Sequence, residues 1–159
     1  MIDGTDRTIL MMLQANGRVS YAEIARQVEM APSAVLERIR KLEERGIIKG
    51  YAAQVDPQAL GQGLLAYVLV RTECASWQVD TAAKIAAIPE VQEVHHIAGE
   101  DCFLVKVRTR DTAALGSLLR DQVSAIECVR STRTTIVLDT VKETTEVNLN
   151  QAVEAEEVS

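Results

Sequence analysis

The sequence has little of what membrane proteins and single-strand-binding proteins need. Its 159 residues include only 1 Trp, 3 Tyr and 1 Phe, too few to line a stacking platform for unpaired bases. No run of 18 apolar residues occurs, and the first ten residues lack the basic start and apolar stretch of a secretory signal. We therefore expect no membrane association and a cytoplasmic location.

Signs of metal binding and catalysis are also scarce. The three cysteines, Cys74, Cys102 and Cys128, lie 28 and 26 residues apart without a CxxC pair, which is neither a metal knuckle nor a disulfide framework. We expect three reduced thiols. His95 and His96 are adjacent, so in a strand they project to opposite faces and cannot share one metal. Because no GxSxG, P-loop, HExxH or GxGxxG motif is present, we expect no metal, no cofactor and no enzyme activity.

The composition is that of a globular protein with an uneven charge distribution. Apolar residues make up 47% and charged residues 25%, and the length suits one domain or two small ones. The formal net charge is -6. Residues 1–50 contain 8 Lys and Arg and 7 Asp and Glu, whereas the remaining residues contain 9 Lys and Arg and 16 Asp and Glu. The segment Ala31–Lys49 contains five basic and three acidic residues. A local basic segment of this kind is typical of phosphate contacts.

Helical spacing of apolar residues predicts three helices at the N-terminus. The first spans Thr5–Ala15 with Thr5 as a possible cap, and the second spans Ser20–Val28 with a capping box from Ser20. The third spans Pro32–Arg45, because proline suits the first helical position and Gly46 ends the pattern. Short helices joined by about three residues are typical of a helix-turn-helix.

The third helix has one apolar and one polar face. At 100° per residue, Val35, Ile39 and Leu42 fall together and are expected to be buried. The opposite face is polar and mostly basic, which favours a recognition helix in the DNA major groove. The alternative is an ordinary amphipathic surface helix. The predicted DNA-contacting residues are Ser33, Ala34, Glu37, Arg38, Arg40 and Lys41.

The rest of the chain alternates between strand-like and helical patterns. A strand is predicted over Ile47–Val55, and Gly61 and Gly63 mark a crossing between two domains. Beyond it we predict strands over Leu64–Glu73, Val91–Ile97, Cys102–Thr109 and Val129–Leu138, and helices over Trp77–Ile88 and Asp111–Ser124. The order βαββαβ is the ferredoxin-like arrangement. The predicted fold class is therefore α+β, with an N-terminal winged helix-turn-helix and a C-terminal ferredoxin-like βαββαβ domain.

These patterns define four segments. We expect a helix-turn-helix domain over residues 1–50, a linker strand and crossing over 51–63, a ferredoxin-like domain over 64–142 and an acidic, frayed tail over 143–159. A ferredoxin-like sheet carries both helices on one face, and the strands at Leu64–Val70 and Phe103–Val107 are apolar on both sides. The bare face predicts contact with a second copy, which would place two recognition helices about 34 Å apart along a duplex.

Several motifs, taken in order and at their spacing, resemble the Lrp/AsnC or feast/famine family of transcriptional regulators over about residues 2–145. In the first half they are Ile2-Asp3-x-x-Asp6-x-x-Ile9-Leu10, the run from Ala31 to Glu43, and Gly46-Ile47-Ile48-Lys49-Gly50-Tyr51. In the second half they are Gly99-Glu100-Asp101-Cys102-Phe103-Leu104-Val105-Lys106 and Thr132-Arg133-Thr134-Thr135.

The resemblance implies a homodimer, often assembled into octamers, that binds double-stranded operator DNA through the N-terminal helices. A small effector, usually an amino acid, would bind in a cleft between subunits of the C-terminal domain. Matching positions give the effector contacts as Gly99, Glu100, Asp101, Cys102, Phe103, Thr132 and Thr134. Thr132 and Thr134 are two apart in a strand, so both hydroxyls can face one carboxylate, while an acidic loop can hold an ammonium group.

Two positions depart from the family pattern. Ala31 precedes Pro32 and has no side-chain oxygen for capping. Cys102 stands where the family often has Asp, so the acids of the turn are Glu100 and Asp101, which could equally well only solvate a hairpin. Two other functions stay open: an effector-independent architectural DNA-binding protein, and a tetrapyrrole decarboxylase of similar architecture with substrate contacts from His95 and His96.

Overall fold

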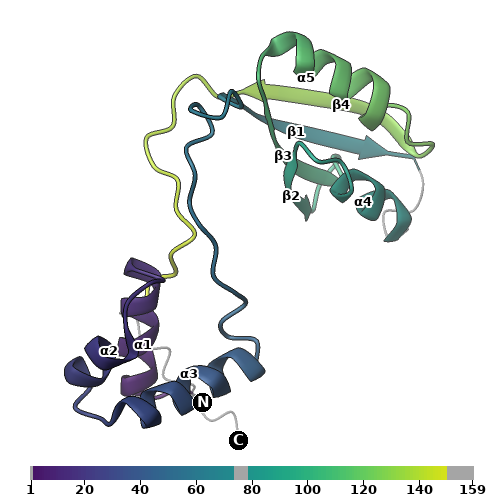
Figure 1. The fold of residues 1–159 in the computed structure, drawn as a ribbon. Coiled ribbons are helices and arrows are strands. Elements are labelled where there is room, and N and C mark those ends of the chain that lie inside the picture. The colour runs from purple at the N-terminus through teal and green to yellow at the C-terminus, as the bar shows by residue number, and fades with distance from the viewer. Residues whose placement is uncertain (1, 74–78, 150–159) are drawn as a thin grey trace, which may run out of the picture. The chain divides into compact units, whose positions relative to one another are not determined.

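The chain folds into two units that are joined twice along the sequence (Figure 1). The computed structural model describes residues 2–73 and 79–149. The first unit contains residues up to Gln54 together with the described residues from Glu143 onwards, and the second extends from Val55 to Lys142. The first unit is therefore discontinuous in sequence.

The first unit is built from three helices around one apolar cluster. These are α1 (Gly4–Ala15), α2 (Tyr21–Gln27) and α3 (Pro32–Glu44). Its fully buried side chains come from all three helices and are Ile9, Ile24, Val35, Ile39 and Leu42. The predicted apolar face of the third helix is thus confirmed, and its polar face is directed away from this core.

Local side-chain bonds fix where the helices begin. The predicted cap Thr5 is wrong, because the Asp3 carboxylate accepts the N–H of Asp6 at 2.7 Å and the Asp6 carboxylate accepts the N–H of Asp3 at 3.3 Å. Ser20 caps α2 as predicted, with its hydroxyl 3.2 Å from the N–H of Glu23, and this is the half of the predicted capping box that the described residues form. Ala31 is the N-cap of α3 and makes no side-chain cap bond, also as predicted.

The connections on either side of α3 differ in their backbone conformation. Between α2 and α3, Glu29 has φ +53°, a left-handed conformation that side chains with a Cβ rarely adopt. After α3 the predicted strand over Ile47–Val55 is wrong. Ile47 and Ile48 instead pack on the helical core, and residues 49–55 pair with no strand in the described part of the chain. A strand needs a partner for its backbone groups, and a sequence pattern cannot report whether one is present.

The second unit has the predicted ferredoxin-like topology. Its strands are β1 (Leu64–Thr72), β2 (Val91–His96), β3 (Phe103–Thr109) and β4 (Val129–Ile136), in the antiparallel order β2-β3-β1-β4. Helix α4 (Val79–Ala86) follows β1, and α5 (Thr112–Leu118) follows β3 and continues as a π-helical turn over Leu119–Val123. The element order βαββαβ is confirmed.

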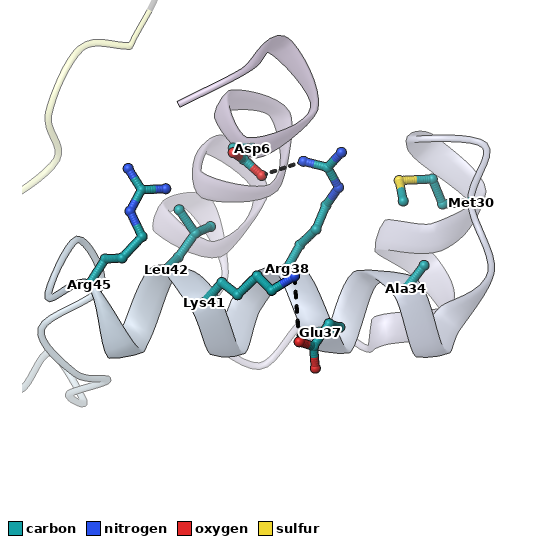
Figure 2. Close-up of a pocket in the computed structure, with 8 residues that line it drawn as sticks. All are labelled: Asp6, Met30, Ala34, Glu37, Arg38, Lys41, Leu42 and Arg45. Atoms are coloured by element: carbon teal, nitrogen blue, oxygen red, sulfur yellow. Dashed lines mark hydrogen bonds and ion pairs between the residues drawn. The ribbon is translucent and has the colours of Figure 1, made fainter. Parts of the chain in front are cut away.

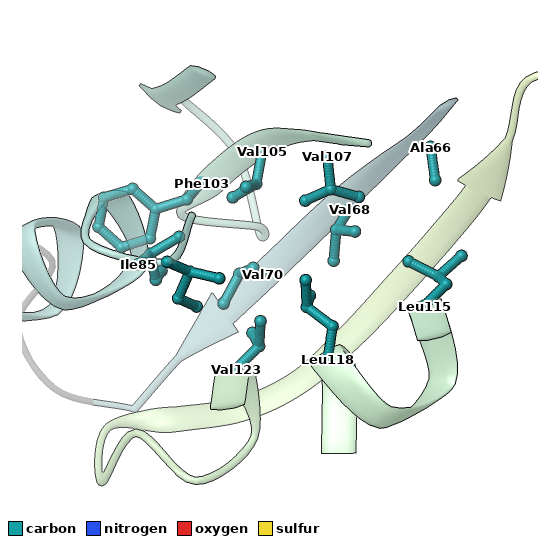
Figure 3. Close-up of a cluster of buried hydrophobic side chains, with 11 residues drawn as sticks. Ala66, Val68, Val70, Ile85, Phe103, Val105, Val107, Leu115, Leu118 and Val123 are labelled. Carbon is teal, nitrogen blue, oxygen red and sulfur yellow. The ribbon is translucent and has the colours of Figure 1, made fainter. Parts of the chain in front are cut away.

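One face of this sheet carries the core. Figure 3 shows side chains from β1 and β3 meeting those from the helices; the cluster includes Val68, Val70, Val105, Val107, Ile85, Leu115 and Leu118. In the described residues no helix covers the opposite face, where Tyr67, Leu69 and Leu104 remain partly exposed. No helix in the described ranges is long and apolar enough to span a membrane.

The expectation of three reduced thiols is wrong. Cys128 is disulfide-bonded, whereas Cys102 is a free thiol and Cys74 lies outside the described residues. Separation along the chain does not limit distance in space, so the cysteine spacing could not exclude this bond.

The C-terminal segment is not frayed over residues 143–149, in contrast to the prediction. The side-chain amide of Gln14 donates to the Val147 carbonyl at 3.1 Å and accepts the Val147 N–H at 2.7 Å. Leu149 packs against the core of the first unit. The acidic residues Glu154, Glu156 and Glu157 of the predicted tail lie outside the described residues.

Candidate functional site

The outward face of α3 presents the predicted polar residues to solvent. Ser33, Glu37, Arg40 and Lys41 are all exposed, and the side chains of Arg40 and Lys41 are 67% and 64% exposed. They extend from a helix whose other face is fixed by three buried side chains. The cationic groups are therefore held on a rigid element and remain accessible to a large ligand.

Both cations have carboxylate partners on the same helix. Arg40 Nε lies 2.9 Å from Glu44 Oε1, and its Nη1 lies 4.0 Å from Glu37 Oε2. Lys41 Nζ lies 3.6 Å from Glu37 Oε1. Exposed pairs of this spacing contribute only a few tenths of a kcal/mol. Phosphate oxygens can therefore replace these carboxylates at little cost.

Arg38 has a different environment from its neighbours on α3. Its Nη1 lies 2.7 Å from Asp3 Oδ2 and 2.8 Å from Asp6 Oδ1, and the Asp6 side chain is only 11% exposed. The pKa of Asp3 is lowered first by the N–H of Asp6 and then by the Arg38 guanidinium. Both carboxylates likewise raise the pKa of Arg38. Arg38 thus connects the N-terminus of α1 to the middle of α3.

A depression of about 370 Å³ lies beside this connection, along the flank of α3 (Figure 2). Its lining comes from α1, from the connection between α2 and α3, and from α3 and the residue that follows it, and consists of Asp6, Met30, Ala34, Glu37, Arg38, Lys41, Leu42 and Arg45. Four of the predicted DNA-contacting residues line this depression: Ala34 and Arg38, which are partly buried, and Glu37 and Lys41, which are exposed. Arg45, which the prediction omitted, adds a further basic group to its edge.

One residue on the outer side of α3 was missed by the prediction. Leu36 is 48% exposed, although its immediate neighbour Val35 is fully buried. It lies one helical turn from both Ser33 and Arg40. Its apolar character alone does not suggest a nucleic-acid contact, but its position 100° from Val35 on the helical wheel already placed it outside the core.

The turn between β2 and β3 holds the acidic residues of the predicted effector site. Gly99 has φ +131°, which glycine adopts without a steric cost. The Asp101 carboxylate accepts a hydrogen bond from Arg133 Nη2 at 2.8 Å, and Glu100 Oε2 lies 3.8 Å from Arg71 Nη1. Both acids therefore face cations of their own chain.

Cys102 and Phe103 fix this turn to the sheet. The Cys102 N–H donates to the Val70 carbonyl at 2.9 Å, and the Thr72 hydroxyl donates to Cys102 Sγ at 3.1 Å. The Phe103 ring is buried and lies against the His96 ring, with centroids 5.3 Å apart. The turn is thus anchored on the side of the sheet that carries the helices.

The two threonines of β4 point to the same face, as predicted. Thr132 pairs with Val70 and Thr134 with Val68, so both side chains lie on the helix-covered face. Arg133 lies between them and points to the other face, where it holds Asp101. Within one chain, the threonine hydroxyls and the Asp101 carboxylate are therefore on opposite sides of β4.

The uncovered face of the sheet contains a charged group among its apolar residues. Lys106 Nζ lies 3.1 Å from Glu93 Oε1, and His95 Nε2 lies 3.1 Å from Glu93 Oε2. These contacts with His95 and Lys106 lower the pKa of Glu93. His95 and His96 project to opposite faces, which confirms that prediction.

Known protein families match both units. A family model described as a winged helix-turn-helix DNA-binding domain matches residues 2–49, and one described as the Lrp/AsnC ligand binding domain matches residues 65–147. The chain is 38% identical over 147 residues to the HTH-type transcriptional regulator FL11 of Pyrococcus furiosus, covering 92% of this chain and 96% of that protein.

Solved structures resemble this chain over most of its length as well. A transcriptional regulator from Neisseria meningitidis, solved in complex with L-methionine, is 32% identical with a TM-score of 0.88, covering 94% of this chain and 98% of that one. The feast or famine regulatory protein from M. tuberculosis, complexed with L-methionine, is 34% identical with a TM-score of 0.85, covering 92% of this chain and 99% of that one.

Proposed function

This chain belongs to the Lrp/AsnC family of transcriptional regulators, and we propose that it binds operator DNA through α3 and responds to an amino acid. The observation that carries the DNA-binding part is the exposed basic pair Arg40 and Lys41 on the face of α3 opposite the core. This pair lies in the unit that matches a DNA-binding family model. We place its action in the cytoplasm.

The residues of α3 have different parts in this proposal. Arg40 and Lys41 contact phosphates and base edges, and Ser33 and Glu37 lie on the same exposed face. Ala34 allows the backbone to approach the duplex closely because its side chain is small. Arg38 acts through its bonds to Asp3 and Asp6, which hold the helix in place.

Replacing both exposed cations tests the DNA interface. The variant R40A/K41A should bind duplex DNA more weakly, and the slope of log K against log salt should become shallower by about 0.9 for each phosphate that is no longer neutralised. The matched control is R110A/R120A, which removes two similarly exposed arginines from the second unit. Equal slopes for the two variants would show that Arg40 and Lys41 of α3 do not contact the DNA.

We further propose that two chains pair through the uncovered face of the sheet and that these dimers assemble into octamers. Tyr67, Leu69 and Leu104 supply apolar surface there, and an open sheet face of this kind is a common dimer interface. Introducing a charge with L69E should produce monomers in sedimentation velocity. An unchanged sedimentation coefficient would exclude this face as the contact.

The effector site is proposed to form between subunits. Thr132 and Thr134 lie on the helix-covered side of β4 and Asp101 on the other, so a ligand that contacts both groups needs them from different chains, which would meet where dimers assemble rather than across the uncovered face. Gly99, Glu100, Cys102 and Phe103 complete the turn that carries Asp101. An amino acid suits this pair of sites, because hydroxyls can hold its carboxylate and the acids its ammonium group.

A thermal-shift screen of the twenty amino acids, beginning with L-methionine, tests the effector. A ligand at about 100 times its Kd adds about 2.7 kcal/mol to the free energy of unfolding. T132V/T134V should abolish the shift, whereas T135V, on the opposite face of the same strand, should retain it. A chain that responds to none of the twenty would instead fit the effector-independent architectural protein.

A further inference from the structure

Leu36 is an apolar side chain within an otherwise polar face. It is 48% exposed on α3, while Ser33, Glu37 and Arg40 around it are polar and exposed. A single exposed leucine on a protein surface needs no explanation. Leu36 differs because it lies between Ser33 and Arg40, one turn from each, within the proposed DNA-binding face.

The major groove offers a specific partner for such a side chain. Thymine is the base that presents a methyl group there, and apolar side chains recognise it by contact. The N-terminal part of a recognition helix is the part that reaches the base edges. Leu36 is the fifth residue of α3, counted from Pro32, and so lies within the first two turns.

Leu36 cannot contribute to the electrostatic attraction for phosphates. The phosphate contacts of Arg40 and Lys41 provide that attraction equally on any sequence. A leucine side chain has no hydrogen-bonding group, so its contribution depends on an apolar group being present opposite it. Its effect should therefore be on sequence preference rather than on overall affinity.

We propose that Leu36 contacts the C5-methyl group of a thymine and makes the protein prefer thymine at that position of its operator. This inference rests on the proposed function, in which the outer face of α3 enters the major groove. Removing that methyl group should weaken binding about fourfold, the factor that corresponds to the burial of one methylene-sized group.

The experiment uses the full chain and duplexes enriched by it from a random-sequence pool. Each dT of the enriched duplex is replaced in turn by deoxyuridine, which lacks only the methyl group, and Kd is measured by fluorescence anisotropy. The wild-type protein should lose about fourfold in affinity when one particular thymine of each half-site is replaced by deoxyuridine. L36A should bind the dT and dU duplexes equally at that position. L36M, which restores an apolar side chain, should recover most of the preference, and R120A, in the second unit, should leave it intact.

The outcomes separate this inference from the function on which it rests. An enriched duplex without any methyl-sensitive thymine, or an L36A variant with the same fourfold preference, would overturn the role of Leu36 alone. Failure to enrich any duplex would overturn both proposals. Alanine favours helices and Leu36 is half-exposed, so L36A should keep the wild-type circular dichroism and its affinity for a non-selected duplex.

Discussion

The connection between Arg38 and α1 gives the clearest quantitative test of how α3 is held. R38M keeps the aliphatic stem but removes the guanidinium that lies 2.7 Å from Asp3 and 2.8 Å from Asp6. The bond to Asp3 joins partly exposed groups and is worth at most about 1 kcal/mol. The bond to Asp6 reaches a carboxylate that is 11% exposed, and losing it costs about 1.5–3 kcal/mol. We expect a total loss of roughly 2 kcal/mol.

The matched control is R40M on the same helix. Among the described residues, Arg40 pairs only with carboxylates on α3, and its side chain is 67% exposed. Its removal should cost no more than about 0.5 kcal/mol. Differential scanning calorimetry of the full chain should show the transition of the first unit lowered by roughly 10 °C in R38M and nearly unchanged in R40M. A shift of equal size in both variants would refute the reasoning.

DNA binding provides a second readout for the same pair of variants. At a temperature where both are folded, R40M should make the salt dependence of binding shallower by about 0.9 and R38M should leave it unchanged. A shallower slope for R38M would mean that Arg38 leaves its two aspartates and contacts a phosphate directly.

Three further outcomes follow from charges and backbone conformation. E37Q removes the carboxylate that pairs with Arg40 and Lys41, so affinity for non-specific duplex DNA should rise and its salt dependence steepen; an unchanged anisotropy titration would contradict this. Glu29 has a left-handed backbone conformation that is unfavourable for a residue with a Cβ, so E29G should raise the free energy of unfolding by up to about 1 kcal/mol, whereas E29A should not. A lower urea midpoint for E29G than for wild type would contradict this expectation. The pKa of Glu93 lies below its ordinary value of 4.5, so its stabilisation is complete above that value and is lost as the pH falls through the lowered one. The urea midpoint of E93Q should therefore vary less with pH, between about 5 and 3, than that of wild type. Parallel curves of urea midpoint against pH would show that Glu93 does not contribute to stability in this way.

Features that depend on near neighbours in sequence could be predicted. The buried face of α3 follows from the spacing of Val35, Ile39 and Leu42, and the cap at Ser20 from its own side chain. The alternation of Thr132 and Thr134 follows from strand geometry alone. The cap of α1 was missed by two residues, because Asp3 and Thr5 are both good capping residues and only the reciprocal bond with Asp6 decides between them.

Features that depend on distant partners could not be predicted. Arg38 resembles another outward cation until Asp6, 32 residues earlier, is placed beside it. The sequence makes Asp101 a candidate ligand for an ammonium group but does not indicate that Arg133, 32 residues later, donates a hydrogen bond to it. The segment around Val147 contains nothing that identifies Gln14, 133 residues away, as its partner. In each case the pattern indicates the type of side chain but not the atom that it meets.

The return of residues 143–149 to α1 means that the DNA-binding unit is made from two stretches of the polypeptide that are far apart in sequence. A single cut after Gln54 would separate it from Leu149 and from the backbone groups that bond Gln14. Exchange of this unit between related regulators would therefore require two crossover points. A hybrid with only one crossover would combine helices α1–α3 of one parent with the C-terminal segment of the other.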